Sequence, residues 1–225
     1  MSPLTLIIGN KNYSSWSMRP WLLLRQVGIP FDEVRIPLYV PGSEIDLAKW
    51  SPSGKVPALH DGEIRVWDSL AICEYLAERF PDKPLWPDDA AARAVARSVS
   101  AEMHAGYGAL RDHMPMNIRA RYPGQGRTPD CLADIERILA IWTDCRARFG
   151  GGGDFLFGRF GIADAMFAPV VLRFETYGVA LEGAARDYAD AVLALPALQA
   201  WVADAVAETE RIEKFERGEA FERDV

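Results

Sequence analysis

The sequence predicts an α/β half followed by an all-helical half. Strand and helix signals alternate over the first eighty residues, whereas the chain after residue 89 carries only helical patterns. Between them lies PDKPLWPDD, whose three prolines each remove a backbone donor and resist helix. We therefore expect one domain over residues 1–80, a linker over 81–89 and an all-helical domain over 90–225.

The first half has the predicted order strand, helix, strand, helix, strand, strand, helix. Pro20 is tolerated in the first turn of a helix, so the first helix must begin near Ser15 to Ser17, and Gly28 closes it. Asp61-Gly62 is typical of a hairpin turn. The other elements are expected at Leu4–Ile8, Phe31–Leu38, a short helix from Ser43, Val56–His60, Glu63–Trp67, and a helix from Asp68 or Ser69 to Phe80.

The second half should contain five helices. The first runs from Ala90 to Met114 and is stopped by Pro115, and Thr128-Pro129-Asp130 caps the next, which ends at Gly150 to Gly153. The third, Ile162 to Tyr177, is strongly apolar, which predicts burial on nearly all sides, with Pro169 as a kink. Gly161 is its N-cap, and Asp164 can accept from the Gly161 N–H. The last two are expected at 186–193 and 196–208.

Composition restricts the class of protein. The 225 residues are 49% hydrophobic and 25% charged, which indicates a globular chain, and the net charge of −7 disfavours nucleic acid as a partner. No apolar run approaches the ~20 residues that span a bilayer, and MSPLTLIIGNKNY has no charged segment before its apolar residues. We expect a cytoplasmic protein without membrane contact or metal, in which Cys73, Cys131 and Cys145 are reduced and buried.

Three sites could together hold a small peptide. Asp68-Ser69 opens a helix, where free N–H groups and a hydroxyl bind a carboxylate while Asp68 pairs with an ammonium. A cis Val56-Pro57 bond would turn the Val56 backbone outward as an edge for an extended peptide. Ser14, just before the first helix, could donate to an anion. Simple helix capping is the alternative for both hydroxyl sites, but the combination matches glutathione.

The chain also resembles the glutathione transferase family over nearly its whole length. The resemblance lies in SSWSMRPWLLL (14–24), SPSGKVPALHDG (51–62), DSLAICEYLAE (68–78) and GRFGIADAMFAPVV (158–171). It implies a thioredoxin-like N-terminal domain followed by an all-helical domain, with glutathione as co-substrate and a homodimer as the assembly.

The resemblance further implies roles for single residues. Counting from Arg19, it identifies Ser14 as the hydroxyl that activates the glutathione thiol, with Tyr13 and Ser15 as alternatives. SSxSxR is most similar to the zeta class, which includes maleylacetoacetate isomerase, but Trp16 replaces the cysteine of that motif. The glutathione site implied comprises Ser15, Lys55, Val56, Pro57, Asp68 and Ser69.

The electrophile is expected between the domains, over the first half of the helix from Ala90 to Met114. The candidate lining residues are Trp16, Met103, His104, Tyr107 and Met114, and ordinary packing of a helix interface is the alternative for each. The leading hypothesis is a serine-type glutathione transferase that attacks a small electrophile. A glutathione-dependent isomerase and a glutathione- or partner-binding module without turnover are the alternatives.

Overall fold

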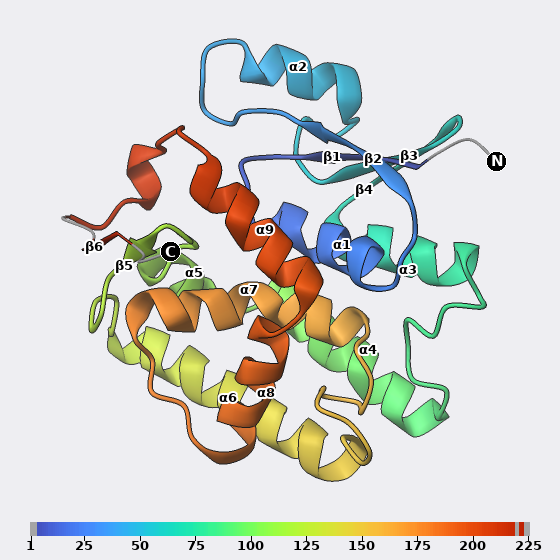
Figure 1. Cartoon of the computed structure of the whole chain (residues 1–225), viewed down its shortest axis with the longest axis vertical. Helices are drawn as coiled ribbons and strands as arrows, with labels where there is room; N and C mark the ends of the chain where they lie inside the picture. Colours follow the sequence, from blue (N-terminus) through green and yellow to red (C-terminus); the bar gives the residue numbers. More distant parts are fainter. Residues whose placement is uncertain (1–3, 219–220, 223–225) are drawn as a thin grey trace.

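The computed structural model describes residues 4–218 and 221–222, and its N-terminal part is a four-stranded mixed sheet with helices on both faces (Figure 1). The strand order is β2-β1-β3-β4, with β1 parallel to β2 and antiparallel to β3. The strands are β1 Leu4–Ile8, β2 Phe31–Arg35, β3 Ala58–Asp61 and β4 Ile64–Trp67. The helices are α1 Ser15–Gln26, α2 Ser43–Trp50 and α3 Ser69–Arg79.

The alternation of side chains along β1 gives the sheet two separate cores. Ile7 packs with Leu47 of α2 in a small cluster on one face. Leu4, Leu6 and Ile8 belong to a much larger cluster on the opposite face, where α1 and α3 lie. Because this larger cluster continues into the helical part of the chain, α1 is enclosed between the sheet and those helices.

The helical part packs around α7. Fifteen of the sixteen residues of this helix are buried, as its uniformly apolar sequence predicts, and it contacts α1, α4 and α8. The helices after the linker are α4 Ala90–Ala105, α5 Gly108–His113, α6 Pro129–Phe149, α7 Ile162–Tyr177, α8 Gly183–Leu193 and α9 Pro196–Ala207, with a 3₁₀ turn at Glu213–Phe215.

The predicted helix from Ala90 to Met114 is wrong, because the chain breaks after Ala105. Tyr107 has φ +62°, in the left-handed region, and Gly106 and Gly108 flank it. Side chains beyond the break therefore point in directions that a continuous helix would not give.

The predicted thioredoxin-like domain followed by a helical domain is confirmed, and the second half departs from a purely helical pattern only in one short strand pair within the described residues. Ala120–Arg121 (β5) pairs antiparallel with Phe221–Glu222 (β6), which ties the end of the chain to the segment between α5 and α6. Two-residue strands carry no periodicity that a sequence pattern could reveal.

Several local predictions are confirmed. Thr128 caps α6 by accepting from the Cys131 N–H at 3.3 Å, and the Asp164 carboxylate accepts from the Gly161 N–H at 2.9 Å. The three cysteines are free and buried. Helix α1 does begin at Ser15, but Pro20 lies in its second turn rather than its first. The predicted second strand is shorter at its end, and the hairpin turn lies one residue later, at Gly62-Glu63.

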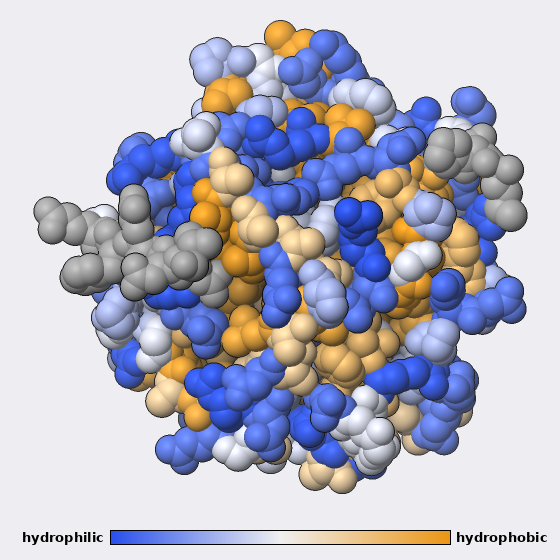
Figure 2. Space-filling view, viewed as in Figure 1, coloured by the Kyte–Doolittle hydropathy of each residue, from blue (hydrophilic) through white to orange (hydrophobic). Residues whose placement is uncertain are grey.

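The surface is mixed in polarity. On the face drawn in Figure 2, hydrophobic areas are divided by hydrophilic residues. Within the described residues, no single helix is long and apolar enough to cross a membrane; α8 and α9 meet the length and composition test only as a pair, with a 68° bend between them.

Candidate functional site

Ser14 stands at the junction between the loop after β1 and α1. A turn closed by the Ser14 N–H on the Asn10 carbonyl, at 2.8 Å, places it as the N-cap of α1, where its Oγ accepts from the Ser17 N–H at 3.3 Å. The Ser14 hydroxyl donates to Ser17 Oγ at 2.7 Å, and Ser17 Oγ in turn accepts from the Gly9 N–H. Ser14 thus lies in a chain of hydrogen bonds at the positive end of a helix dipole.

The two alternative hydroxyls are engaged elsewhere. The Tyr13 hydroxyl donates to Glu216 at 2.6 Å and accepts from Arg119 and from the Ile212 N–H. Burial and the Glu216 carboxylate raise the pKa of Tyr13. Ser15 is buried and accepts from Arg173 at 3.2 Å. Of the three hydroxyl residues, Tyr13 and Ser14 line the cavity described below, and the Tyr13 hydroxyl already has three partners.

Two guanidinium groups lie close to the Trp16 ring. The Arg19 and Arg111 groups sit 4.3 and 4.5 Å from its ring centroid, and the His104 ring makes an edge contact at 5.3 Å. These contacts connect α1 to α4 and α5 across the domain boundary. Trp16, a departure from the zeta motif, is therefore held by cations from both halves of the chain.

Arg19, Arg111 and Arg173 form a cluster of positive charges next to Trp16. Arg19 is fully buried; its Nε donates to the Met166 carbonyl at 3.2 Å, while Nη1 and Nη2 have no hydrogen-bond partner among the described residues. Burial, with the positive charges of Arg111 and Arg173, holds the pKa of Arg19 well below its usual value. The cluster therefore places positive charge near the start of α1, which the carboxylates of Asp68 and Asp134 offset only in part.

Sequence reasoning missed Arg111 and Arg173. Arg173 is the only basic residue of α7, and a buried cation among the apolar residues APVVLRF was a usable signal. Arg111 had no comparable signal, because it comes to face Trp16 only through the break at Tyr107.

Asp68 and Ser69 form a second polar site, at the start of α3. Asp68 has φ +78°, unusual for a residue with a side chain, and its Oδ1 accepts from the Leu70 and Ala71 N–H groups. Its Oδ2 lies 3.2 Å from His104 Nε2. Ser69 Oγ is buried without a hydrogen-bond partner among the described residues. Strained backbone beside an unsatisfied buried hydroxyl is typical of a ligand site.

His104 is a neutral neighbour of Asp68. Burial lowers its pKa, and the nearby charges of Arg19 and Arg111 lower it further, whereas Asp68 acts in the opposite direction. The side chain remains partly exposed. Because a neutral imidazole carries no positive charge, His104 does not form an ion pair with the Asp68 carboxylate.

Two adjoining cavities connect these groups. The Ser14 cavity, of about 680 Å³, and the Asp68 cavity, of about 510 Å³, share Trp16, Lys55 and Val56 in their walls. Pro57 and Ser69 line the Asp68 cavity, and the Val56-Pro57 bond is cis. The structure therefore brings Ser14, Lys55, Val56, Pro57, Asp68 and Ser69 along one continuous cleft, whereas Ser15 lines neither cavity.

The candidate electrophile residues divide into two groups. Trp16 and His104 line the cleft, but Met103, Tyr107 and Met114 do not: all three are buried, and the Tyr107 hydroxyl donates to Glu102 at 2.7 Å. Met103 lies in α4, before the break, and belongs to the helical core, and Tyr107 and Met114, after the break, belong to the same core. For these three residues the packing interpretation is the better one.

The other walls of the Ser14 cavity come from segments that sequence reasoning did not select. They are the β2–α2 loop, with Leu38, Tyr39 and Val40, the helix α2, with Ser43, Glu44 and Leu47, and the C-terminal segment, with Phe215. The Phe215 ring lies 5.7 Å from the Tyr13 ring and 6.2 Å from the Tyr39 ring. An exposed loop tip and a chain end show no periodic pattern, so their convergence had no sequence signal. No group of three His, Cys, Asp or Glu side chains suited to a metal occurs in residues 4–218.

Comparisons with known proteins agree with this arrangement. Residues 13–79 match the family model for the glutathione S-transferase N-terminal domain, and residues 89–204 match that for the C-terminal domain. A probable maleylacetoacetate isomerase of Caenorhabditis elegans is 36% identical over 172 residues, covering 74% of this chain and 77% of the relative. A stringent starvation protein A homolog of Pasteurella multocida is 30% identical over 165 residues, covering 72% of each.

A solved structure shares the fold. The glutathione transferase homolog from Burkholderia gl BGR1, with bound glutathione, superposes with a TM-score of 0.69 at 23% identity, covering 91% of this chain and 98% of that one. The thioredoxin-like mixed sheet followed by a helical domain, together with both family matches, leads to one conclusion: this chain is a member of the glutathione S-transferase family of enzymes.

Proposed function

We propose that this protein is a glutathione transferase in which the Ser14 hydroxyl stabilises the glutathione thiolate for attack on a small electrophile. The observation that carries the proposal is the continuous cleft with Ser14 at one end and Asp68-Ser69 at the other. Within it, residues 1–80 hold glutathione and residues 90–225 complete the site. We also propose a homodimer, in which the half-exposed Ile64 and Trp67 of β4 become covered.

The clamp at the start of α3 suits the amino-acid head of glutathione. Ser69 Oγ has no hydrogen-bond partner among the described residues and can donate to a carboxylate, while the Asp68 carboxylate can accept from an ammonium. Lys55 and Val56 lie between this clamp and Ser14, where an extended peptide backbone would run.

Activation requires a modest free energy. A thiol of pKa about 8.5 is roughly 3% ionised at pH 7, and a lowering by two pKa units corresponds to about 2.7 kcal/mol. A hydrogen bond from Ser14 to the thiolate contributes about 1.5–3 kcal/mol, and the α1 dipole about 0.3–1 kcal/mol. When the Ser14 proton turns from Ser17 to the thiolate, Ser14 Oγ still accepts from the Ser17 N–H. The buried arginines add a positive field of the right sign.

The reaction is a nucleophilic substitution or addition at carbon. The thiolate sulfur forms a C–S bond, and either a leaving group departs with the bonding electron pair or the product carbanion takes a proton. We place the electrophile in the part of the Ser14 cavity walled by Tyr39, Val40 and Phe215. Apolar and aromatic walls favour an apolar electrophile.

The first prediction concerns Ser14→Ala. Removal of a charge-assisted hydrogen bond should lower kcat/KM for conjugation roughly 10- to 100-fold, while calorimetric titration with S-alkyl glutathione shows unchanged affinity. Ser15→Ala is the matched control, because Ser15 faces Arg173, and should retain activity. No binding of glutathione at millimolar concentration contradicts the proposal as a whole; equal activity in Ser14→Ala contradicts only the role of this hydroxyl.

Isomerisation is a second candidate function, supported by the 36% identity to a protein named a probable maleylacetoacetate isomerase. In that reaction the thiolate adds to a cis double bond, the resulting single bond rotates, and the thiolate is expelled, so glutathione is not consumed. Trp16 in place of the motif cysteine distinguishes this chain from the zeta pattern. Turnover of a cis-enedione without loss of free thiol would assign the isomerase; thioether product assigns the transferase. Binding without either product indicates a non-catalytic module.

A further inference from the structure

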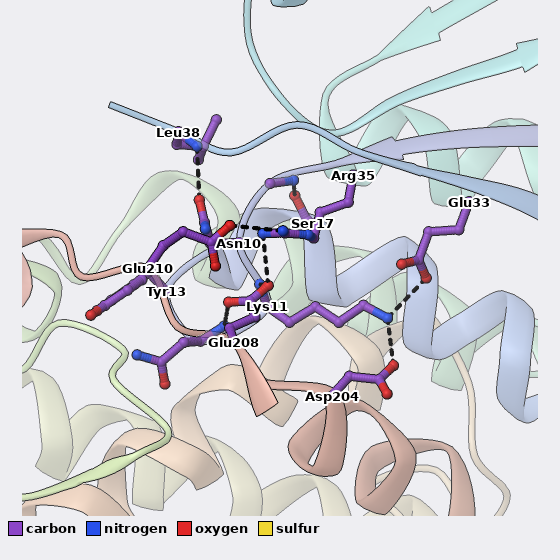
Figure 3. Close-up of polar contacts among 12 residues, drawn as sticks. Asn10, Lys11, Tyr13, Ser17, Glu33, Arg35, Leu38, Asp204, Glu208 and Glu210 are labelled. Atoms are coloured by element: carbon purple, nitrogen blue, oxygen red, sulfur yellow. Dashed lines mark hydrogen bonds and ion pairs between the residues drawn. The ribbon is translucent and has the colours of Figure 1, made fainter. Parts of the chain in front are cut away.

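We infer that Glu208 is a positioning residue for Ser14, acting from the opposite half of the chain. This inference rests on the proposed function. Glu208 follows α9, and its side chain is 7% exposed. Its two carboxylate oxygens accept from consecutive backbone N–H groups, those of Lys11 at 2.7 Å and Asn12 at 3.0 Å. Figure 3 shows Glu208 against the Lys11 backbone.

The geometry of the turn explains why an outside acceptor is needed. The N–H groups of Tyr13 and Ser14 both donate to the Asn10 carbonyl, which closes the turn. The N–H groups of Lys11 and Asn12 donate to Glu208. A buried N–H without an acceptor is costly, so the Glu208 carboxylate fixes the conformation of this turn. Ser14 follows Asn12 by two residues, so the conformation of this turn sets the position of Ser14 in the cleft.

Glu208 is itself held in place. Arg119 donates to its carbonyl and also to the Tyr13 hydroxyl, and Arg35 lies 3.4 Å from its carboxylate. Burial raises the pKa of Glu208, although the two N–H donors oppose this effect. Arg35 of β2 thus holds the Glu208 carboxylate, and Arg119, from the segment before β5, holds the Glu208 backbone, so both parts of the residue are fixed relative to the turn.

The neighbouring Asp204 provides a matched control. Its carboxylate lies in the same cluster, 2.7 Å from Lys11 Nζ, but contacts the side chain rather than the backbone of the turn (Figure 3). It is more than half exposed, and Lys11 keeps a second partner, Glu33, at 3.0 Å. Changing this acid to its amide removes the same charge without disturbing the two backbone hydrogen bonds.

The test compares Glu208→Gln with Asp204→Asn. The glutamine oxygen can accept from one N–H, but its amide group presents hydrogens to the other, so the turn should shift. We expect kcat/KM to fall on the order of 10- to 100-fold, the loss typical of a displaced catalytic group. The pKa of the bound glutathione thiol, measured from the ultraviolet absorbance of its thiolate, should rise, while KM for glutathione changes little because Asp68-Ser69 is untouched. Asp204→Asn should match the wild type.

The outcomes separate this inference from the proposed function. If wild type lowers the thiol pKa of bound glutathione and Glu208→Gln does so equally, Glu208 is only structural and the inference is overturned, even if the melting temperature falls. If wild type binds no glutathione, the proposed function itself fails. Should Glu208→Gln not fold, Glu208→Asp, which is one methylene shorter, replaces it, and an intermediate rise in the thiol pKa is expected.

Discussion

Asp164 both holds local structure together by hydrogen bonds and makes the stability of the fold depend on pH. Its Oδ1 accepts from the Leu156 N–H and its Oδ2 from the Gly161 N–H, so it joins the loop before α7 to the start of that helix. Burial raises its pKa to about 7, although both amide donors favour the ionised form. The folded carboxyl therefore holds a proton at a pH where the unfolded one, near 3.8, has lost it.

This shift predicts a loss of stability as the pH rises. Between pH 4 and pH 7 the native state binds more protons than the unfolded state at this site, so its contribution to the free energy of unfolding is greatest below pH 4 and declines toward pH 7. Asp164→Asn should remove this slope. Urea denaturation of both proteins at several pH values measures it; a constant difference between them across pH 5 to 7 contradicts the assignment.

At the scale of elements, the structure and the sequence position of Gly161, the N-cap of α7, predict opposite effects of its substitution on stability. Serine is normally a better N-cap than glycine, so Gly161→Ser would be expected to stabilise α7. In the structure, however, a Cβ at Gly161 would lie 2.8 Å from the Leu85 carbonyl oxygen, which also accepts from the Ile162 N–H at 3.0 Å. The backbone of the linker occupies the space that a side chain would need.

We therefore predict that Gly161→Ser and Gly161→Ala both destabilise the protein, by about 1–3 kcal/mol as is typical of overpacking. The serine variant should be the less affected by about 1 kcal/mol, because its hydroxyl can still cap the helix. Chemical denaturation measures both. A serine variant more stable than wild type would mean that the linker moves aside without cost.

The elements also show where sequence reasoning succeeds and where it stops. Helix α7 has the bounds that its apolar run and the Gly161–Asp164 pair predict, because both signals are local. The helix predicted over Ala90 to Met114 fails at Tyr107, where φ +62° between two glycines depends on how α5 packs. That failure misassigned Tyr107 to the electrophile site and concealed Arg111, whereas Met103, before the break, is buried within α4.

For the site, the sequence predicts the groups of the N-terminal half but not those from the other half. Ser14, Val56-Pro57 and Asp68-Ser69 each stand at a helix start or a strand entry that short-range signals identify. Phe215 and Glu208 reach the cleft and its loop through contacts between residues about 200 positions apart, as in the Lys11 N–H to Glu208 bond. No short pattern reports such pairing.

For the whole molecule, the two halves share one hydrophobic core. The larger cluster of buried residues extends from Leu4 in β1 to Ala205 in α9. Trp21 of α1 and Trp201 of α9 make an edge contact at 5.1 Å, and Lys11 Nζ lies 4.8 and 5.4 Å from their rings. The two domains are therefore distinct in chain topology, but they are stabilised by the same hydrophobic core.

A shared core predicts that the halves unfold together. Intrinsic fluorescence comes from seven tryptophans, five of which lie in residues 1–86, with Trp21 and Trp201 at the boundary between the halves. Far-ultraviolet circular dichroism reports mainly on the helices after residue 90. Under equilibrium urea unfolding the two signals should give coincident transitions, because exposure of α1 would leave a large apolar surface uncovered on both sides. Trp201→Phe, which also removes the hydrogen bond from its indole to the Lys11 carbonyl at 3.0 Å, should shift both transitions to lower urea by the same amount. If fluorescence changes first while the helical signal persists, the N-terminal half unfolds independently, and the Glu208 contact would then be broken before the rest of the helical core.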